Sequence, residues 1–191
     1  MLAFALCAGV ASAQDEVRVV KVRKSAKRSI NWSGFQTGSS PAAQTFHKTL
    51  QNDLRNSGWF SKAHAGKGDI SLTGSARLNG GQVRADCRVY DNATQRPYLN
   101  RSFSTEAANV RRLAHQVADA IVAAVTGHEG FASARFVMVG TKTGKKELYL
   151  ADSDGHSLQQ ITRDGTVSVA PKWGAGNQIV YTSYLNRFPD V

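Results

Sequence analysis

The chain has 191 residues, of which 41% are apolar and 20% are charged, and its formal net charge is +10. This length and composition allow a buried core in one domain, or in one domain and part of a second. The positive charge raises the question of a nucleic-acid partner. The basic residues are spread along the chain, however, and their one cluster, at 21–28, has no aromatic residues within it. We therefore expect no nucleic-acid partner.

Residues 1–13 have the pattern of a signal peptide. The apolar run "MLAFALCAGVASA" ends in Ala11, Ser12 and Ala13, small residues of the kind that a signal peptidase accepts. The run is too short to cross a bilayer as a helix, so export is favoured over a membrane anchor. Removal of this leader leaves Cys87 as the remaining cysteine, which excludes an internal disulfide in the mature chain. In an exported protein the basic cluster at 21–28 would face anionic envelope components.

Residues 14–24 are predicted to form an extended N-terminal arm. The segment "DEVRVVKVRK" begins with Asp15 and Glu16 and then alternates between apolar and basic side chains, as an extended strand does. The polar stretch after this arm has no clear period.

An amphipathic helix is expected from Pro41. Phe46, Leu50 and Leu54 recur every four residues, and a Ser-Gly pair at 57–58 ends the run. We expect the next two residues, Trp59 and Phe60, to pack under the helix.

Three strands and a second helix follow. The strands are expected at 69–77, 82–91 and 98–105, and Asn79-Gly80-Gly81 suits a tight hairpin between the first two. Alternation along the second strand places Cys87 on its buried face. A helix at about 107–125 has an apolar stripe and stops at Gly127. Residues 25–128 are therefore predicted to be an α/β domain, two helices on a small mixed sheet.

The pattern changes at Gly130. From there short strands, expected at 134–140, 146–153, 158–164 and 178–184, alternate with turns rich in Gly, Asp, Thr and Asn. Such a meander is the unit of propeller blades. We expect residues 129–191 to form the first blade and the start of the second blade of an incomplete β-propeller, and the Pro-x-Trp of Pro171 and Trp173 to be a turn.

The histidines give no sign of catalysis or of a metal site. None has a second ligand at zinc-site spacing, and no Gly-x-Ser-x-Gly occurs in the chain. His115 and Asp119 lie one helical turn apart and can hydrogen-bond, for which we favour a structural or interface role. Asp152, Asp154 and Gly155 resemble the opening of a calcium loop, but Arg163 replaces its closing carboxylate, so a turn is favoured. We expect no catalytic residue, metal or cofactor.

Three segments together resemble one family: "LAHQVADAIVAAVTGHEGFASARFVMV" at 113–139, "KELYLADSDGHSLQQIT" at 146–162 and "VAPKWGAGNQIVYTSY" at 169–184. Their order is similar to that in the TolB family, the periplasmic component of the Tol-Pal envelope system. "NDLRNSGWF" at 52–60 and "DEVRVVKV" at 15–22 resemble further family segments. The resemblance assigns structural or interdomain roles to eight residues: His115, Asp119, Gly127, Phe131, Asp154, Gly155, Pro171 and Trp173.

The resemblance implies a non-enzymatic periplasmic adaptor, peripheral to the envelope, that consists of an α/β domain and a six-bladed propeller. The propeller would bind Pal, the peptidoglycan-associated lipoprotein, largely through later blades. The N-terminal arm would bind TolA, an inner-membrane protein, by adding a strand to it. The arm residues that carry over are Asp15, Glu16, Val17, Arg18, Val19 and Val20. The turn after Trp173 departs from the family's Ser-Pro-Asp-Gly pattern.

Two other functions remain open from the sequence. The chain can be the N-terminal part of a propeller-bearing serine peptidase whose catalytic domain is missing. It can also be a binder of nucleic acid or of another anionic polymer, whose affinity would fall steeply with salt.

Overall fold

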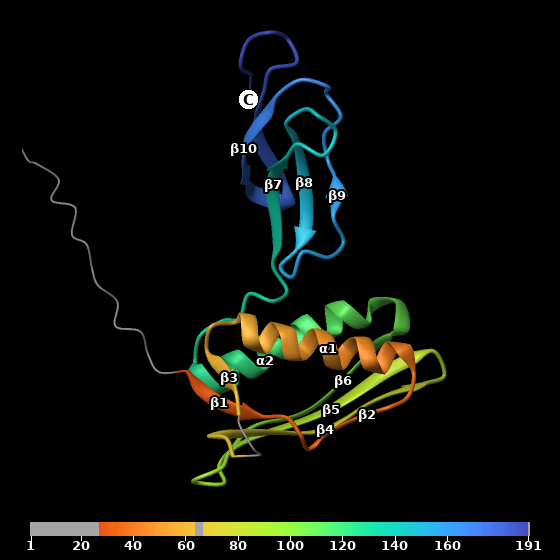
Figure 1. Ribbon diagram of the computed structural model, residues 1–191, viewed down its shortest axis with the longest axis vertical. Helices are drawn as coiled ribbons and strands as arrows, with labels where there is room; N and C mark the ends of the chain where they lie inside the picture. Colours follow the sequence, from red (N-terminus) through yellow and green to blue (C-terminus); the bar gives the residue numbers. More distant parts are fainter. Residues whose placement is uncertain (1–26, 64–66, 191) are drawn as a thin grey trace, which may run out of the picture.

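A computed structural model of the protein describes residues 27–63 and 67–190, which form two parts (Figure 1). The first part is an α/β layer. Its strands lie in one sheet of order β3-β1-β4-β5-β6, with β2 paired to β4 beyond the end of β1. The elements of this layer are β1 (Arg28–Asn31), β2 (Phe35–Thr37), α1 (Pro41–Asn56), β3 (Phe60–Lys62), β4 (Ile70–Asn79), β5 (Gln82–Asp91), β6 (Pro97–Glu106), the short 3-10 helix η1 (Ala107–Asn109) and α2 (Val110–Thr126).

Helices α1 and α2 pack side by side on one face of the sheet (Figure 1). Helix α1 begins where the Ser40 hydroxyl accepts a hydrogen bond from the Ala43 N–H, at 3.2 Å, with Pro41 as the first helical residue. Helix α2 ends at Gly127, whose φ of 74° is the left-handed conformation that closes many helices. The prediction of two helices on a mixed sheet is therefore confirmed.

The core lies between the two helices and the sheet. Phe46, Leu50 and Leu54 of α1 and the apolar stripe of α2 meet the inward side chains of β5, all of them buried. Each large apolar side chain buried in this way contributes about 1.5–3 kcal/mol to folding. Cys87 is part of this core, as its place in the alternating strand predicts, and burial raises the pKa of its thiol to about 12.

The β4–β5 hairpin has the tight turn that its sequence predicts. Asn79 pairs with Gln82, and the two residues between them, Gly80 and Gly81, have φ values of 56° and 82°. Positive φ at both loop positions matches the twist of the flanking strands.

The short strands β1, β2 and β3 were not predicted from the sequence. They lie in stretches without a clear period, and each is defined by parallel pairing, β1 and β2 with β4 and β3 with β1. The expectation for Phe60 is confirmed, since it is buried in β3. The expectation for Trp59 is wrong: its side chain is 36% exposed and stacks on the ring of His128, with ring centroids 5.0 Å apart.

The second part consists of β-strands and stands on the helical side of the layer (Figure 1). Strands β7, β8 and β9 form one antiparallel sheet, and β10 pairs antiparallel with β11. These elements are β7 (Arg135–Gly140), β8 (Glu147–Asp152), β9 (Gln159–Gln160), β10 (Ser168–Trp173), the 3-10 turn η2 (Ala175–Asn177) and β11 (Ile179–Ser183).

Strand β10 corrects the prediction of a turn at Pro171 and Trp173. Both residues lie inside the strand, where the register shifts between Val169 and Lys172 and Ala170 has a φ of 52°. A proline lacks the N–H that a regular ladder uses, and a bulge is one of the few places where a strand accepts it. The strand expected at 158–164 is also shorter, limited to two residues of β9.

Among the described residues no helix is long and apolar enough to cross a lipid bilayer.

Candidate functional site

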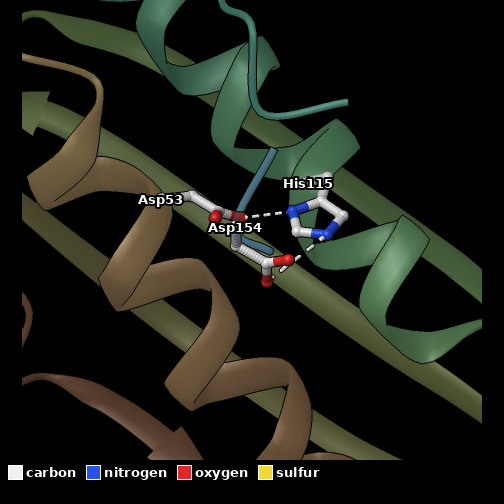
Figure 2. A group of neighbouring side chains, drawn as sticks. All are labelled: Asp53, His115 and Asp154. Atoms are coloured by element: carbon white, nitrogen blue, oxygen red, sulfur yellow. Dashed lines mark hydrogen bonds and ion pairs between the residues drawn. The ribbon is translucent and has the colours of Figure 1, made fainter. Parts of the chain in front are cut away.

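A cluster of buried charged groups lies where the two parts meet. It consists of Asp53 on α1, His115 on α2 and Asp154 in the turn between β8 and β9 (Figure 2). The three residues are far apart in the sequence, and the docking of the turn on the two helices brings them together.

His115 is the centre of this cluster. Its side chain is 4% exposed, and its Nδ1 lies 2.8 Å from Asp53 Oδ2, a hydrogen bond between the two helices. Its Nε2 faces Asp154 Oδ2 at 3.8 Å, which is an ion-pair distance and too long for a hydrogen bond (Figure 2). The imidazole therefore connects both helices of the layer to the second part.

Asp154 is held in place from both parts. Its Oδ1 accepts a hydrogen bond from the His156 backbone N–H at 3.0 Å, and Gly155 supplies the positive φ of 81° that the turn needs. Its Oδ2 accepts an ion-paired hydrogen bond from Nη2 of Arg111, one helical turn before His115 on α2. The turn of the second part is thus attached to α2 by a cation as well as by the imidazole.

The carboxylates change the protonation of the cluster. Burial disfavours the protonated form of His115, but the hydrogen bond and charge of Asp53 and the charge of Asp154 outweigh it, so the pKa of the imidazole is raised. Burial also acts on Asp154, but the His156 N–H and the positive charges of Arg111 and His115 outweigh it and lower the pKa of that carboxyl. The two carboxylates therefore shift His115 toward its protonated form.

His115 and Asp119 have the spacing of a hydrogen-bonded pair but bond to other partners. Asp119 lies one turn further along α2, but its Oδ1 and Oδ2 accept hydrogen bonds from the backbone N–H groups of Ala132 and Ser133, at 2.7 and 2.9 Å. These two residues belong to the linker between α2 and β7. A Cβ atom at Gly130 would overlap the Asp119 side chain, so a glycine is needed where the linker passes. Asp119 therefore fixes the linker, and His115 fixes the turn.

The same three groups have the chemistry of metal ligands. One oxygen or nitrogen from each of Asp53, His115 and Asp154 lies within 4.8 Å of the others. The Nδ1 of His115 is already bound to Asp53, and Arg111 contacts the Asp154 oxygen that a metal would use. The Arg111 guanidinium supplies the positive charge that Asp154 requires, so we interpret the cluster as an ion network. No local ligand spacing in the sequence marks this group, because Asp53, His115 and Asp154 come from three separate segments.

The other residues predicted as structural or interdomain have different positions. Gly127 ends α2, and Gly155 forms the turn that presents Asp154. Phe131 lies in the linker, 48% exposed, beside a small cavity of about 20 Å³ that Asp53 and Asp154 also line. Pro171 and Trp173 belong to β10 of the second part. The arm residues Asp15, Glu16, Val17, Arg18, Val19 and Val20 lie outside the described residues.

Sequence reasoning missed Asp53 and Arg111 as members of the junction. The sequence does predict that Asp53 is buried. It precedes Leu54 and follows Leu50 by three residues, and so lies on the apolar stripe of α1. An acid is rarely buried without a partner, and its position on that stripe required one. The identity of that partner depended on how α1 and α2 pack.

Among the described residues, the hydrogen bond of His115 joins it to a carboxylate. His115 is buried, and within the described chain its hydrogen bond goes to Asp53, not to a serine, threonine or cysteine that could act as nucleophile. The groups of the junction connect the two parts by hydrogen bonds and ion pairs.

Comparisons with known proteins agree with this architecture. No family model matches the chain. The chain is 34% identical over 112 residues to the Tol-Pal system protein TolB of Syntrophotalea carbinolica, covering 59% of this chain and 26% of that relative. It is 28% identical over 188 residues to the Tol-Pal system protein TolB of Cereibacter sphaeroides, covering 84% of this chain and 42% of that relative.

The fold is also similar to a solved structure. A crystal structure of TolB from Acinetobacter baumannii matches 86% of this chain with a TM-score of 0.74, at 22% identity, and the match covers 46% of that chain. The chain spans less than half the length of the relatives it matches.

Proposed function

Since the chain is similar to the N-terminal part of TolB in sequence and in fold, we propose that it acts as a non-enzymatic adaptor in a Tol-Pal envelope system. It works in the periplasm, where it contacts a Pal-like lipoprotein and a TolA-like inner-membrane protein. The observation that carries this proposal is the fold match with TolB, in which the α/β layer and the β part align together over 86% of the chain.

The exposed apolar side chains of the second part support contact with further protein. Phe136, Met138, Trp173 and Val180 belong to β7, β10 and β11, and each is more than a third exposed. Side chains of this size on sheet surfaces pack against neighbouring sheets in propellers, or against partners. We assign the binding of the Pal-like lipoprotein to a propeller surface.

The junction supports an adaptor rather than an enzyme. A protein with two binding surfaces needs a defined geometry between them, and the buried network around His115 holds the two parts together through charge-assisted hydrogen bonds. That network serves attachment, because the Nδ1 of its histidine is bound to Asp53 and the Nε2 faces Asp154.

The N-terminal arm is assigned to the TolA-like protein. In an extended strand Val17 and Val19 would lie on one face with Asp15, and Arg18 and Val20 on the other face with Glu16. An arm of this kind binds by adding a strand to a partner sheet, with main-chain hydrogen bonds supplying affinity.

A pull-down from envelope extract tests the proposal, with the intact chain and a variant lacking residues 15–22 as baits. We expect the intact chain to recover a TolA-like protein and the shortened chain to lose it. Val19→Pro removes one backbone donor from the arm, and Val19→Thr is the matched control that keeps it. Val19→Pro should weaken recovery and Val19→Thr should not. Equal recovery by all four baits would remove the arm from the mechanism, and no envelope partner with the intact chain would contradict the adaptor function.

A further inference from the structure

The face of the sheet that points away from the helices is uncovered in the part of the chain that the structure describes (Figure 1). It is formed by the outward side chains of β4, β5 and β6, which alternate with the buried ones. None of the large apolar side chains that are exposed in the α/β layer lies on this face: Trp59 is in the loop before β3, and Leu78 pairs with the inward Val83.

Two arginines face each other directly on this surface. Arg77 of β4 is the cross-strand partner of Arg84 of β5, and both point outward and are exposed. Like charges directly opposite one another destabilise a sheet. Arg88, four residues along β5, lies on the same face and is also exposed. The sheet therefore concentrates three guanidinium groups on one side at a cost in stability.

The carboxylate of Asp86 neutralises the Arg84 guanidinium. Asp86 lies between Arg84 and Arg88 on β5, and its Oδ1 accepts hydrogen bonds from Arg84 Nε at 3.2 Å and Ser102 Oγ at 2.5 Å. These contacts orient the Arg84 guanidinium. No salt bridge joins Arg77 or Arg88 to a carboxylate among residues 27–63 and 67–190. The face keeps an excess of positive charge available to a ligand.

A shallow hollow lies across the same strands. It has a volume of about 610 Å³, and the glycines at 34 and 74 are among its lining residues. A Cβ atom at Gly74 would overlap the backbone carbonyl of Asp86, so this position requires glycine. The charged side chains that line the hollow are Arg84, Arg88 and Arg101, with Asp86 as the acid among them. Its neutral hydrogen-bonding side chains are Gln36, Thr73, Ser75, Asn100 and Ser102.

This combination fits one class of ligand, and we propose that the open face of the sheet binds an acidic polysaccharide. Guanidinium groups bind carboxylate or phosphate with two parallel hydrogen bonds, and hydroxyl and amide side chains bind the sugar hydroxyls. Protein partners usually bury apolar or aromatic anchors at the centre of an interface, and this face offers none. A hollow also fits a polymer strand better than the flat surface of a membrane.

Binding at this face uses none of the residues assigned to the adaptor function. The arm, the junction and the exposed strands of the second part lie elsewhere, so a polysaccharide site and a Tol-Pal partner can be present or absent independently.

Titration of the purified chain with oligosaccharides tests the site, using alginate for carboxylates and phosphomannan for phosphates. The test variant is Arg77→Gln with Arg88→Gln, two exposed positions whose replacement should leave the circular-dichroism spectrum unchanged. The matched control is Arg55→Gln, which removes an exposed arginine from α1 on the opposite side of the layer. We expect at least one oligosaccharide to bind, with an affinity that falls as salt is raised.

The test variant should lose about tenfold or more in affinity, since each lost guanidinium removes a charge-assisted hydrogen bond, and Arg55→Gln should stay within about twofold. Amide NMR shifts on titration should map to Ser75, Asp86 and Ser102. Three results would overturn the proposal: no binding of either oligosaccharide at low salt, an equal loss in Arg55→Gln, or equally tight binding of polyglutamate or anionic vesicles through the same arginines. The last result would assign the face to an acidic protein or a membrane.

Discussion

In the α/β layer the large apolar side chains that remain exposed are Trp59 and Leu78, whereas in the β7–β11 part most strands carry at least one. The layer packs two helices over a sheet and buries both helical stripes. In the second part most side chains of β8 are buried. The side chains of β7 and β11 are exposed or half-buried.

The stability of the two parts therefore depends on their surroundings to different degrees. The layer has a contiguous hydrophobic core, which supports independent folding. The second part buries a charged group that its hydrogen bonds must satisfy: the Glu147 carboxylate, 2% exposed, accepts hydrogen bonds from the Thr162 hydroxyl and from the Gly165 N–H at 2.8 Å. Its attachment to the layer, through Asp119, Asp154 and His115, is therefore part of its stability.

The largest expected effect comes from truncating a core side chain of the layer. Phe46 is 0% exposed and Phe136, the matched control in β7, is 46% exposed. Phe46→Ala should lower the free energy of unfolding by about 3–5 kcal/mol, because it removes buried surface and leaves a cavity. Phe136→Ala should change it by only about 0.5 kcal/mol. Urea unfolding followed by circular dichroism measures both, and equal losses would contradict the difference between the two parts.

The next effect concerns the linker. Asp119→Ala removes the two charge-assisted hydrogen bonds to the Ala132 and Ser133 amides and should destabilise the closed linker by about 2–3 kcal/mol. Hydrogen exchange should become faster at those two amides and remain slow in β4 and β5. Glu129→Ala, an exposed acid in the same linker, is the control and should leave exchange unchanged. Unchanged exchange in Asp119→Ala would show that packing alone positions the linker.

A smaller effect is expected from pH at the junction. The pKa of His115 is raised in the folded chain, so its stabilising charge is fully present below the ordinary histidine pKa and is lost as pH rises through the raised value. NMR titration of the imidazole should give a pKa above the ordinary one, and Asp53→Asn should lower it, since it removes a buried negative charge. Arg111 and Asp154 also face this imidazole.

Arg112→Gln serves as the control for the titration, because Arg112 is exposed on α2 and hydrogen-bonds Asn109. A His115 pKa that stays the same in Asp53→Asn would mean that Asp53 does not determine the charge of the network.

The features that the sequence predicted are those with a local period. The apolar stripe of α1, the alternation that buries Cys87 and the Gly-Gly turn after Asn79 each follow from neighbouring residues. Strands β1, β2 and β3 were missed because each is defined by two or three pairings with partners more than 30 residues away, and no local pattern marks such pairings.

The junction could be predicted only in part. His115 and Asp119 have the spacing of a helical pair, which allows a hydrogen bond between them. Both residues do act at the junction, but with partners from other segments: Asp53 lies 62 residues before His115, and the linker amides lie 13 and 14 residues after Asp119. Tertiary packing selects among such partners, and a single sequence does not record that selection.

The smallest expected effect is at Gly127, the residue that ends α2 and starts the linker between the two parts. Its φ is 74°, and a Cβ atom there would meet no atom within 4 Å, so replacement by alanine costs backbone strain alone. Gly127→Ala should destabilise the layer by about 1 kcal/mol, and Gly127→Asn by less, because asparagine tolerates this conformation better. Thermal unfolding of the three proteins gives the order. If Gly127→Ala also accelerated exchange at Ala132, the end of α2 and the linker would move as one unit, and the boundary between the two parts would lie inside α2 rather than after it.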